Sequence, residues 1–181
     1  MNATVYIATS LDGFIARENG DLDWLHSVES APGGEDYGYR AFMETVDAIV
    51  MGRHTYDKVL TFDKWPYDKP VVVLTNRPLT IPAALAGCIE ATAGPPADIL
   101  ARLSGRGMQH AYVDGGKTVQ GFLEAGLIQR LIITRIPVII GRGIPLFGPV
   151  SRDIPLRHVE TRQYPNGLIQ SEYRIRLKDE G

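Results

Sequence analysis

The sequence has very little cysteine and no long hydrophobic run. Cys88 is the single cysteine among 181 residues, which excludes an internal disulfide and a cysteine-rich zinc site. We expect Cys88 to be a small buried hydrophobe on a strand. The longest apolar run, near residues 131–140, contains Thr134, Arg135 and Pro137 and is too short for a membrane span. The first residues do not form a signal peptide. We therefore expect a cytoplasmic protein that binds no membrane and holds no metal.

The sequence also has no excess of charge of either sign. The chain has nineteen Lys and Arg residues and twenty-one Asp and Glu residues, for a net charge of -2. This balance does not favour binding to nucleic acid. Hydrophobic residues make up 44% and charged residues 22%, an ordinary balance for a globular protein. The chain has no repeat, low-complexity tract or linker, so we expect one domain over residues 1–181.

Short apolar runs alternate with segments that have the periodicity of helices. The predicted strands cover residues 5–9, 48–51, 70–75, 88–91, 110–113 and 130–140, and the predicted helices cover residues 36–45, 54–60, 96–103 and 117–125. Residues 169–177 alternate between apolar and polar side chains, which predicts an antiparallel strand paired with residues near 156–161. This order predicts an α/β fold of three layers. Its mixed, mostly parallel sheet has about eight strands, with helices on both faces and a C-terminal antiparallel hairpin.

Three of the predicted strands end in polar or glycine-rich residues. The three ends are Gly52-Arg53-His54-Thr55, Thr75-Asn76-Arg77 and Asp114-Gly115-Gly116-Lys117-Thr118. In an open α/β sheet, ligands bind beyond the carboxyl ends of the strands. The two consecutive glycines before a helix would let the backbone approach a pyrophosphate at the helix N-terminus. The alternative is that these glycines serve only the turn.

Two arginines follow neighbouring strand ends. Taken alone, each of Arg53 and Arg77 would be interpreted as an ordinary solvated charge on the surface. Together, beside hydroxyl and amide side chains, the two guanidinium groups favour a cradle for a 2′-phosphate. We expect His54 to act as a donor toward phosphate rather than as a catalyst.

Four segments, in this order along most of the chain, resemble known reductases. Residues 50–56, VMGRHTY, resemble the cofactor motif of dihydrofolate reductases. Residues 6–16 (YIATSLDGFIA), 113–118 (VDGGKT) and 137–147 (PVIIGRGIPLF) resemble the reductase domain of the riboflavin-pathway deaminase-reductase. The resemblance implies the dihydrofolate reductase-like fold and NADPH as hydride donor. It also implies a small heterocyclic substrate, pteridine-like or pyrimidine-like, and a homodimer.

Carried over by position, the resemblance assigns most of the cofactor site. The contacts with the 2′-phosphate and the pyrophosphate fall on Gly52, Arg53, His54 and Thr55, and those along the adenosine end on Thr75, Asn76 and Arg77. Further pyrophosphate contacts fall on Gly115, Gly116, Lys117, Thr118 and Val119. The nicotinamide pocket falls on Ile7, Ala8 and Ile15.

The substrate side departs from these families. The riboflavin-pathway reductases usually carry a lysine that engages the substrate where this chain has Phe14, which argues against a phosphoribosyl substrate. Asp36 takes the region of the carboxylate with which dihydrofolate reductases bind the pterin ring, or it only caps a helix. Trp24 either covers the active site and meets the substrate, or it has only a structural role as part of a lid packed on the core. Asp12 closes a turn by accepting backbone N–H groups, and with Asp36 it is a candidate catalytic residue.

Two functions from different classes remain open on the sequence alone. One is an NADPH-dependent reductase. The other is a protein that binds NADPH to sense or sequester it without turnover, since no obvious proton donor stands out in the substrate pocket. Steady oxidation of NADPH with a pterin or an aminopyrimidinone would separate the two.

Overall fold

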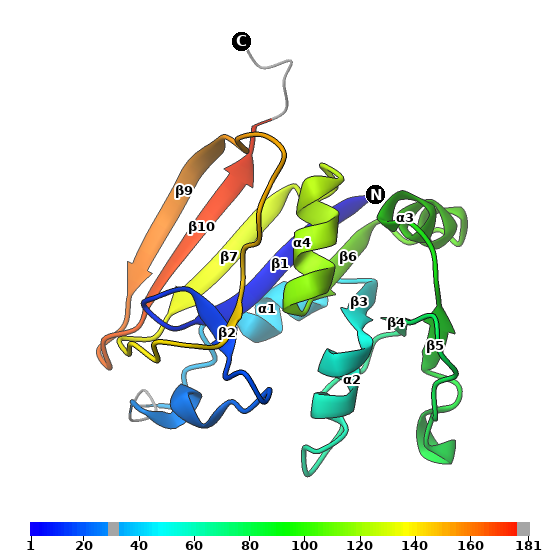
Figure 1. Ribbon diagram of the computed structural model, residues 1–181, viewed down its shortest axis with the longest axis horizontal. Helices are drawn as coiled ribbons and strands as arrows, with labels where there is room; N and C mark the ends of the chain where they lie inside the picture. The colour runs from blue at the N-terminus through cyan, green and yellow to red at the C-terminus, as the bar shows by residue number, and fades with distance from the viewer. Residues whose placement is uncertain (29–32, 177–181) are drawn as a thin grey trace.

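The fold is built on one sheet of eight strands (Figure 1). The computed structural model describes residues 1–28 and 33–176. In chain order the strands are β1 (Asn2–Thr9), β3 (Ala48–Gly52), β4 (Val71–Leu74), β5 (Ile89–Thr92), β6 (His110–Asp114), β7 (Arg130–Arg135), β9 (Leu156–Gln163) and β10 (Ile169–Ile175). Their order across the sheet is β5-β4-β3-β6-β1-β7-β10-β9. The strands from β5 to β7 in this order are parallel to one another. Strand β10 runs antiparallel to both of its neighbours, β7 and β9. The predicted α/β fold with a mixed, mostly parallel sheet is confirmed.

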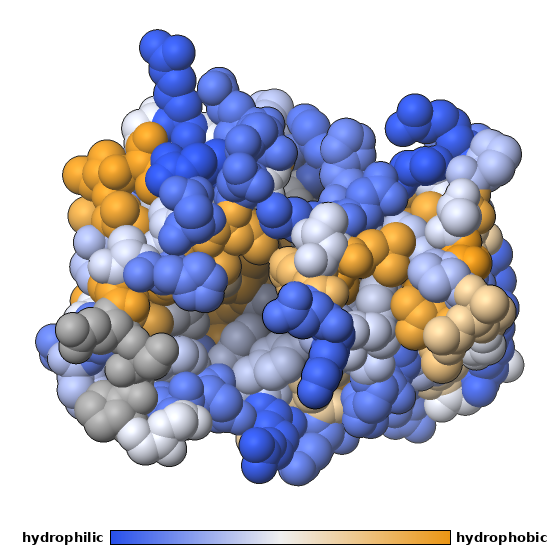
Figure 2. All heavy atoms as spheres, turned by 90° about the horizontal axis from the view of Figure 1, so that it is seen from below, coloured by the Kyte–Doolittle hydropathy of each residue, from blue (hydrophilic) through white to orange (hydrophobic). Residues whose placement is uncertain are grey.

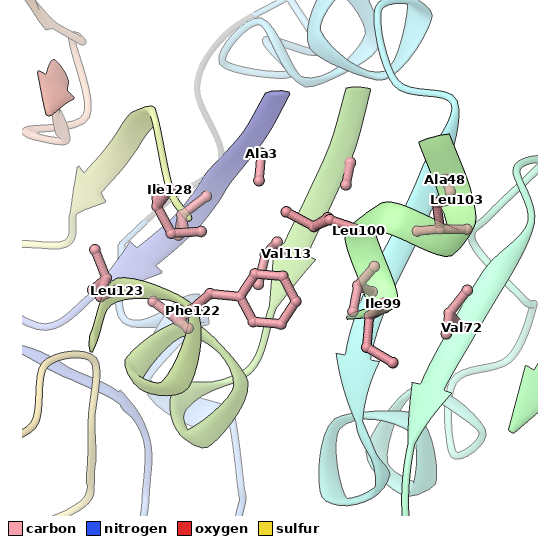
Figure 3. Packing of buried hydrophobic residues seen from close by; sticks show 14 of the residues in the cluster. Ala3, Ala48, Val72, Ile99, Leu100, Leu103, Val113, Phe122, Leu123 and Ile128 are labelled. Atoms are coloured by element: carbon pink, nitrogen blue, oxygen red, sulfur yellow. The ribbon is translucent and has the colours of Figure 1, made fainter. Parts of the chain in front are cut away.

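Helices cover both faces of the sheet because successive strand side chains point to opposite faces. Ala3 and Val5 of β1 face α3 (Pro96–Gly105) and α4 (Gly116–Glu124). Figure 3 shows Phe122 of α4 lying against the sheet on this side. On the other face, α1 (Tyr39–Glu44) and Tyr56 of α2 (Arg53–Val59) pack against β3, β4 and β6.

A second, smaller sheet pairs β2 (Phe14–Ala16) with β8 (Ile144–Pro145). Two short 3-10 helices, η1 (Asp23–His26) and η2 (Ala83–Leu85), complete the described elements. None of the helices that the structure describes is both long and apolar enough to pass through a bilayer.

Three local predictions were wrong in detail. β7 ends at Arg135, short of residue 140, because Pro137 has no N–H to continue a ladder. Cys88 is exposed rather than buried on a strand, since it belongs to the turn before the edge strand β5, where its N–H bonds the Leu85 carbonyl. α1 begins at Tyr39 and not at Asp36.

The parallel strands bring the three polar strand ends to one edge of the sheet. Gly52 lies opposite Leu74 of β4, and Met51 lies opposite Asp114 of β6. In Figure 1 this edge is the lower one, between the η1 segment and α2. Figure 2 views the molecule from that side and shows a hollow near its centre, partly lined by hydrophobic residues.

Candidate functional site

The turns that follow β3 and β6 touch each other. A Cβ added to Gly52 would lie 2.9 Å from Thr118 Oγ1, and a Cβ added to Gly115 would collide with Thr55 Oγ1. Gly115 also has φ +91°, a conformation that residues with a side chain rarely adopt. The two turns therefore form one continuous surface at the start of α2 and α4, and only glycine allows this approach.

The first turn of α4 offers donors at this surface. The first helical hydrogen bond runs from the Val119 N–H to the Gly115 carbonyl at 2.8 Å. The N–H groups of Gly116, Lys117 and Thr118 precede it, so the helix itself does not satisfy them. These groups can donate to an anion at the positive end of the helix dipole.

Gly116 serves a different purpose from Gly115. A Cβ on Gly116 would lie 3.1 Å from the Pro145 carbonyl oxygen and 3.2 Å from side-chain carbons of Ile144 and Ile15. The second glycine is therefore needed for the packing of β2 and β8 against α4. It does not need a bound cofactor to explain it.

The two candidate arginines differ in their contacts. Arg53 donates from Nη1 to the Pro78 carbonyl at 2.9 Å, and its Nε lies 3.5 Å from Asp57 Oδ2. The backbone of Arg77 is held by Thr75, whose Oγ1 accepts the Arg77 N–H at 3.1 Å. Within residues 1–28 and 33–176, no side-chain hydrogen bond or ion pair engages the Arg77 guanidinium, which is exposed. Arg53 thus supports the loop that presents Arg77, and the Arg77 guanidinium is available to a ligand.

The other candidate cofactor residues lie around this surface. His54, Asn76 and Lys117 are exposed at the strand ends. Ile7 and Ile15 are half-buried and pack on the core beneath α4. Ala8, near the end of β1, packs instead against the cluster that contains Trp24. The donors, the free cation and the half-buried apolar floor fit a nicotinamide dinucleotide with a 2′-phosphate.

Trp24 lies on η1 with only 2% of its surface exposed. It packs against Ile136 and Leu168, near Ala8, which matches a lid packed on the core. Its buried Nε1 has no hydrogen-bond partner, and an unpaired buried donor costs free energy. Phe14, also a candidate substrate contact, is half-buried on β2 opposite Pro145.

The two candidate carboxylates are occupied by backbone groups. Asp12 accepts the Gly141 N–H at 2.8 Å and the Ile140 N–H at 3.3 Å, and the Ser10 hydroxyl together with these bonds lowers its pKa. Asp36 accepts the N–H groups of Arg40 and Gly38, which lower its pKa. Both side chains hold turns, and Asp36 caps the start of α1 from outside the helix.

The sequence analysis did not single out Asp114, whose carboxyl group stands out in the structure. Asp114 is the last residue of β6, and burial raises the pKa of its carboxyl group to about 6. The Gly115 N–H donates to Oδ1 at 2.8 Å and offsets part of this rise. The available signal was an acidic residue that directly follows a buried apolar strand and precedes the two glycines.

Aromatic rings surround this carboxyl group. Burial, and then the charge of Asp114, raise the pKa of Tyr39 to about 12, and the same two causes raise the pKa of Tyr67. Trp65 lies between the rings of Tyr67 and Tyr56, at centroid distances of 5.3 Å and 6.1 Å. These rings come from α1, from α2 and from the segment after α2.

The described residues contain no group of three or more His, Cys, Asp and Glu side chains able to hold a metal ion.

Known proteins resemble this chain in sequence and in fold. The family model for the RibD C-terminal domain matches residues 3–170. The Bacillus subtilis (strain 168) protein named "Uncharacterized protein YwjB" is 39% identical over 164 residues, which cover 88% of this chain and 90% of that protein. A Shewanella sp. PV-4 crystal structure, named "putative riboflavin biosynthesis protein", has a TM-score of 0.92 and 43% identity, and the match covers 98% of this chain and 100% of that one.

A more distant structure shows the breadth of the fold. Dihydrofolate reductase from Enterococcus faecalis, complexed with NADP(H), has a TM-score of 0.69 at 17% identity, over 98% of this chain and 97% of that chain. At this identity the likeness concerns the fold alone. The chain belongs to the RibD C-terminal domain family, a family of reductases with the dihydrofolate reductase-like fold.

Proposed function

We propose that this protein is an NADPH-dependent reductase that passes a hydride to a small heterocycle of the pteridine or pyrimidine class. The observation that carries the proposal is the contact between the two strand-to-helix turns, at Gly52 and Gly115, beside the free guanidinium of Arg77. Two helix starts and a cation at one sheet edge match the charge of a phosphorylated dinucleotide. The family supports the same conclusion.

Different residues bind different parts of the cofactor in this proposal. The N–H groups of Gly116, Lys117 and Thr118 bind the pyrophosphate, and Thr55 lies across the same surface. Arg77 pairs with the 2′-phosphate. Bound NADPH supplies the hydride, and the protein orients the nicotinamide and excludes water from it.

Arg53 has a supporting part in this assignment. Its hydrogen bond to the Pro78 carbonyl fixes the loop that presents Arg77. His54 and Asn76 complete the polar rim of the cofactor site. Val119 takes no part in it, because its side chain is buried in the core and its N–H bonds the Gly115 carbonyl.

The substrate occupies the hollow next to the nicotinamide pocket formed by Ile7, Ala8 and Ile15. Tyr39 and Tyr67 lie near Asp114 at this edge of the sheet, and their rings favour a flat ring as substrate, because rings stack or meet edge to face. Phe14 offers an apolar surface rather than a charge, which favours a ring without a phosphoribosyl group.

Turnover tests the proposal directly. The purified protein, with NADPH, is screened against 7,8-dihydropterin, other pteridines and aminopyrimidinones, and NADPH oxidation is followed at 340 nm. Steady oxidation with one of these rings supports the reductase. Tight NADPH binding with no oxidation for any ring favours the non-catalytic sensing protein instead.

The assembly and the compartment belong to the same proposal. We infer a cytoplasmic homodimer, on the strength of the family resemblance. Size-exclusion chromatography with light scattering gives the mass in solution, and a mass of one chain at micromolar concentration contradicts the dimer.

A further inference from the structure

We propose that Asp114 is the acid of this site and delivers a proton to a ring nitrogen of the substrate. The inference rests on the proposed reductase function and deepens it, since it names the reacting group as the C=N bond of a neutral ring. It assigns a role to a side chain that the cofactor does not need.

The position of Asp114 suits this role. Asp114 ends β6 in the middle of the sheet, directly before Gly115 of the cofactor surface, so its carboxyl group lies beside the place assigned to the dinucleotide. Side chains alternate along a strand, which puts Asp114 on the same face as Tyr112 and α1. This is the face on which Tyr39 lies.

The carboxyl group of Asp114 has few partners and keeps contact with the surface. The Gly115 N–H donates to Oδ1 at 2.8 Å, and a hydrogen bond from the Tyr112 side chain also lowers the pKa of the carboxyl group. Asp114 is half-buried rather than sealed in the core. A ligand at this edge of the sheet can therefore reach its carboxyl group.

The surroundings make Asp114 the group that changes charge near neutral pH. The titratable side chains packed near it are Tyr112 on its own strand, Tyr6 on β1, Tyr39 on α1 and Tyr67 in the segment after α2. Burial raises the pKa of all four tyrosines, so they stay neutral. No Lys or Arg of the described residues contributes to the pKa of Asp114, which is raised by burial to about 6.

The chemistry balances with one proton. Reduction of a C=N bond adds a hydride to carbon and a proton to nitrogen; the O–H bond of Asp114 breaks and the new N–H bond forms. The carboxylate then regains its proton from solvent. The tyrosine hydroxyls cannot replace it, because their raised pKa values make them weak acids at this pH.

The first test uses binding and no turnover. The probe is 2,4-diaminopyrimidine, a basic ring that can place an N–H cation against a carboxylate. Calorimetric titration of the NADPH-saturated protein at pH 7.5 compares wild type, Asp114→Asn and the control Asp98→Asn, an exposed carboxylate on α3. We expect Asp114→Asn alone to weaken the probe by about tenfold or more and to leave the NADPH affinity unchanged. Equal probe affinity in all three proteins overturns the inference.

The second test uses the pH profile on a ring that the wild type reduces. We expect kcat/KM of the wild type to fall as pH rises through the pKa of Asp114, because the acid form is the donor. Asp114→Asn should lower kcat/KM by about 100-fold or more and abolish this fall. Asp114→Glu keeps an acid, so it should retain a pH limb with a shifted midpoint.

The outcomes separate this inference from the reductase itself. Wild-type turnover with an unchanged rate and pH profile in Asp114→Asn overturns the role of Asp114 and leaves the reductase standing. Absence of wild-type turnover on every ring overturns the reductase, while the probe titration still decides whether Asp114 faces the hollow. If Asp114→Asn does not fold, the midpoint in Asp114→Glu decides, and an unshifted midpoint contradicts the inference.

Discussion

The contact between the two cofactor turns can be tested by adding one methyl group at Gly115. The change Gly115→Ala meets two penalties in this structure. The backbone at φ +91° is costly for a residue with a side chain, by about 1–3 kcal/mol, and the collision with Thr55 Oγ1 is an overpacking defect of about 1–3 kcal/mol. We expect the free energy of unfolding to fall by about 2–6 kcal/mol.

A second substitution separates the two penalties. Thr55→Ala removes the hydroxyl that the new methyl group would meet, so the double variant should regain about 1–3 kcal/mol and keep the backbone penalty. Urea denaturation of the four proteins in this cycle measures the coupling. Calorimetric titration with NADPH should show weakened binding in Gly115→Ala.

The cycle can refute the reasoning in two ways. Wild-type stability and NADPH affinity in Gly115→Ala would mean that the turn tolerates a side chain and that no close approach occurs there. Full additivity of the two substitutions would mean that Gly115 and Thr55 do not touch.

Three further outcomes follow from the same site. Gly116→Val should destabilise the protein in urea denaturation, because its side chain meets Pro145 and Ile144; a stable variant that has lost only NADPH binding would contradict this packing role. Phe14→Lys should raise kcat/KM on the phosphoribosylamino-pyrimidine intermediate of riboflavin synthesis, on which we expect wild type to be weak, and efficient wild-type turnover would show that Phe14 is compatible with that substrate. The raised pKa of Asp114, about 6 against an ordinary 3.8, means that the native state holds this proton more tightly than the unfolded state. The free energy of unfolding should therefore fall as pH rises from 4 through 6, and urea denaturation between pH 4 and 8 should show a flatter dependence in Asp114→Asn, whereas equal slopes would contradict the burial of this carboxyl group.

The sequence predicted the strands and helices that have a clear local pattern. The β-branched run that forms β4 and the apolar i, i+3, i+4 pattern of Val119, Phe122 and Leu123 in α4 depend only on neighbouring residues. The alternation that forms β10 is also local. The polar ends of β3, β4 and β6 could be placed at one edge because parallel strands end on the same side of a sheet.

The substrate side depends on contacts that no local pattern records. Asp114 becomes an unusual acid because burial raises its pKa, and Tyr39 and Tyr67, which come near it from two distant segments, belong to these surroundings. Gly116 is constrained by Pro145, almost thirty residues further along the chain. Asp12 accepts backbone N–H groups as expected, but they belong to Ile140 and Gly141 and not to the turn that contains Asp12, and the sequence could not show this distant contact.

The most direct test of the central claim is a calorimetric titration of the wild-type protein with NADPH and with NADH. Arg77 is the cation left free for the 2′-phosphate, so Arg77→Ala is titrated beside Arg157→Ala, an exposed arginine on the edge strand β9. The account predicts that wild type and Arg157→Ala bind NADPH more tightly than NADH. Arg77→Ala should lose about tenfold or more in NADPH affinity with little change for NADH. Equal affinity of wild type for the two cofactors, or binding of neither, would contradict the account.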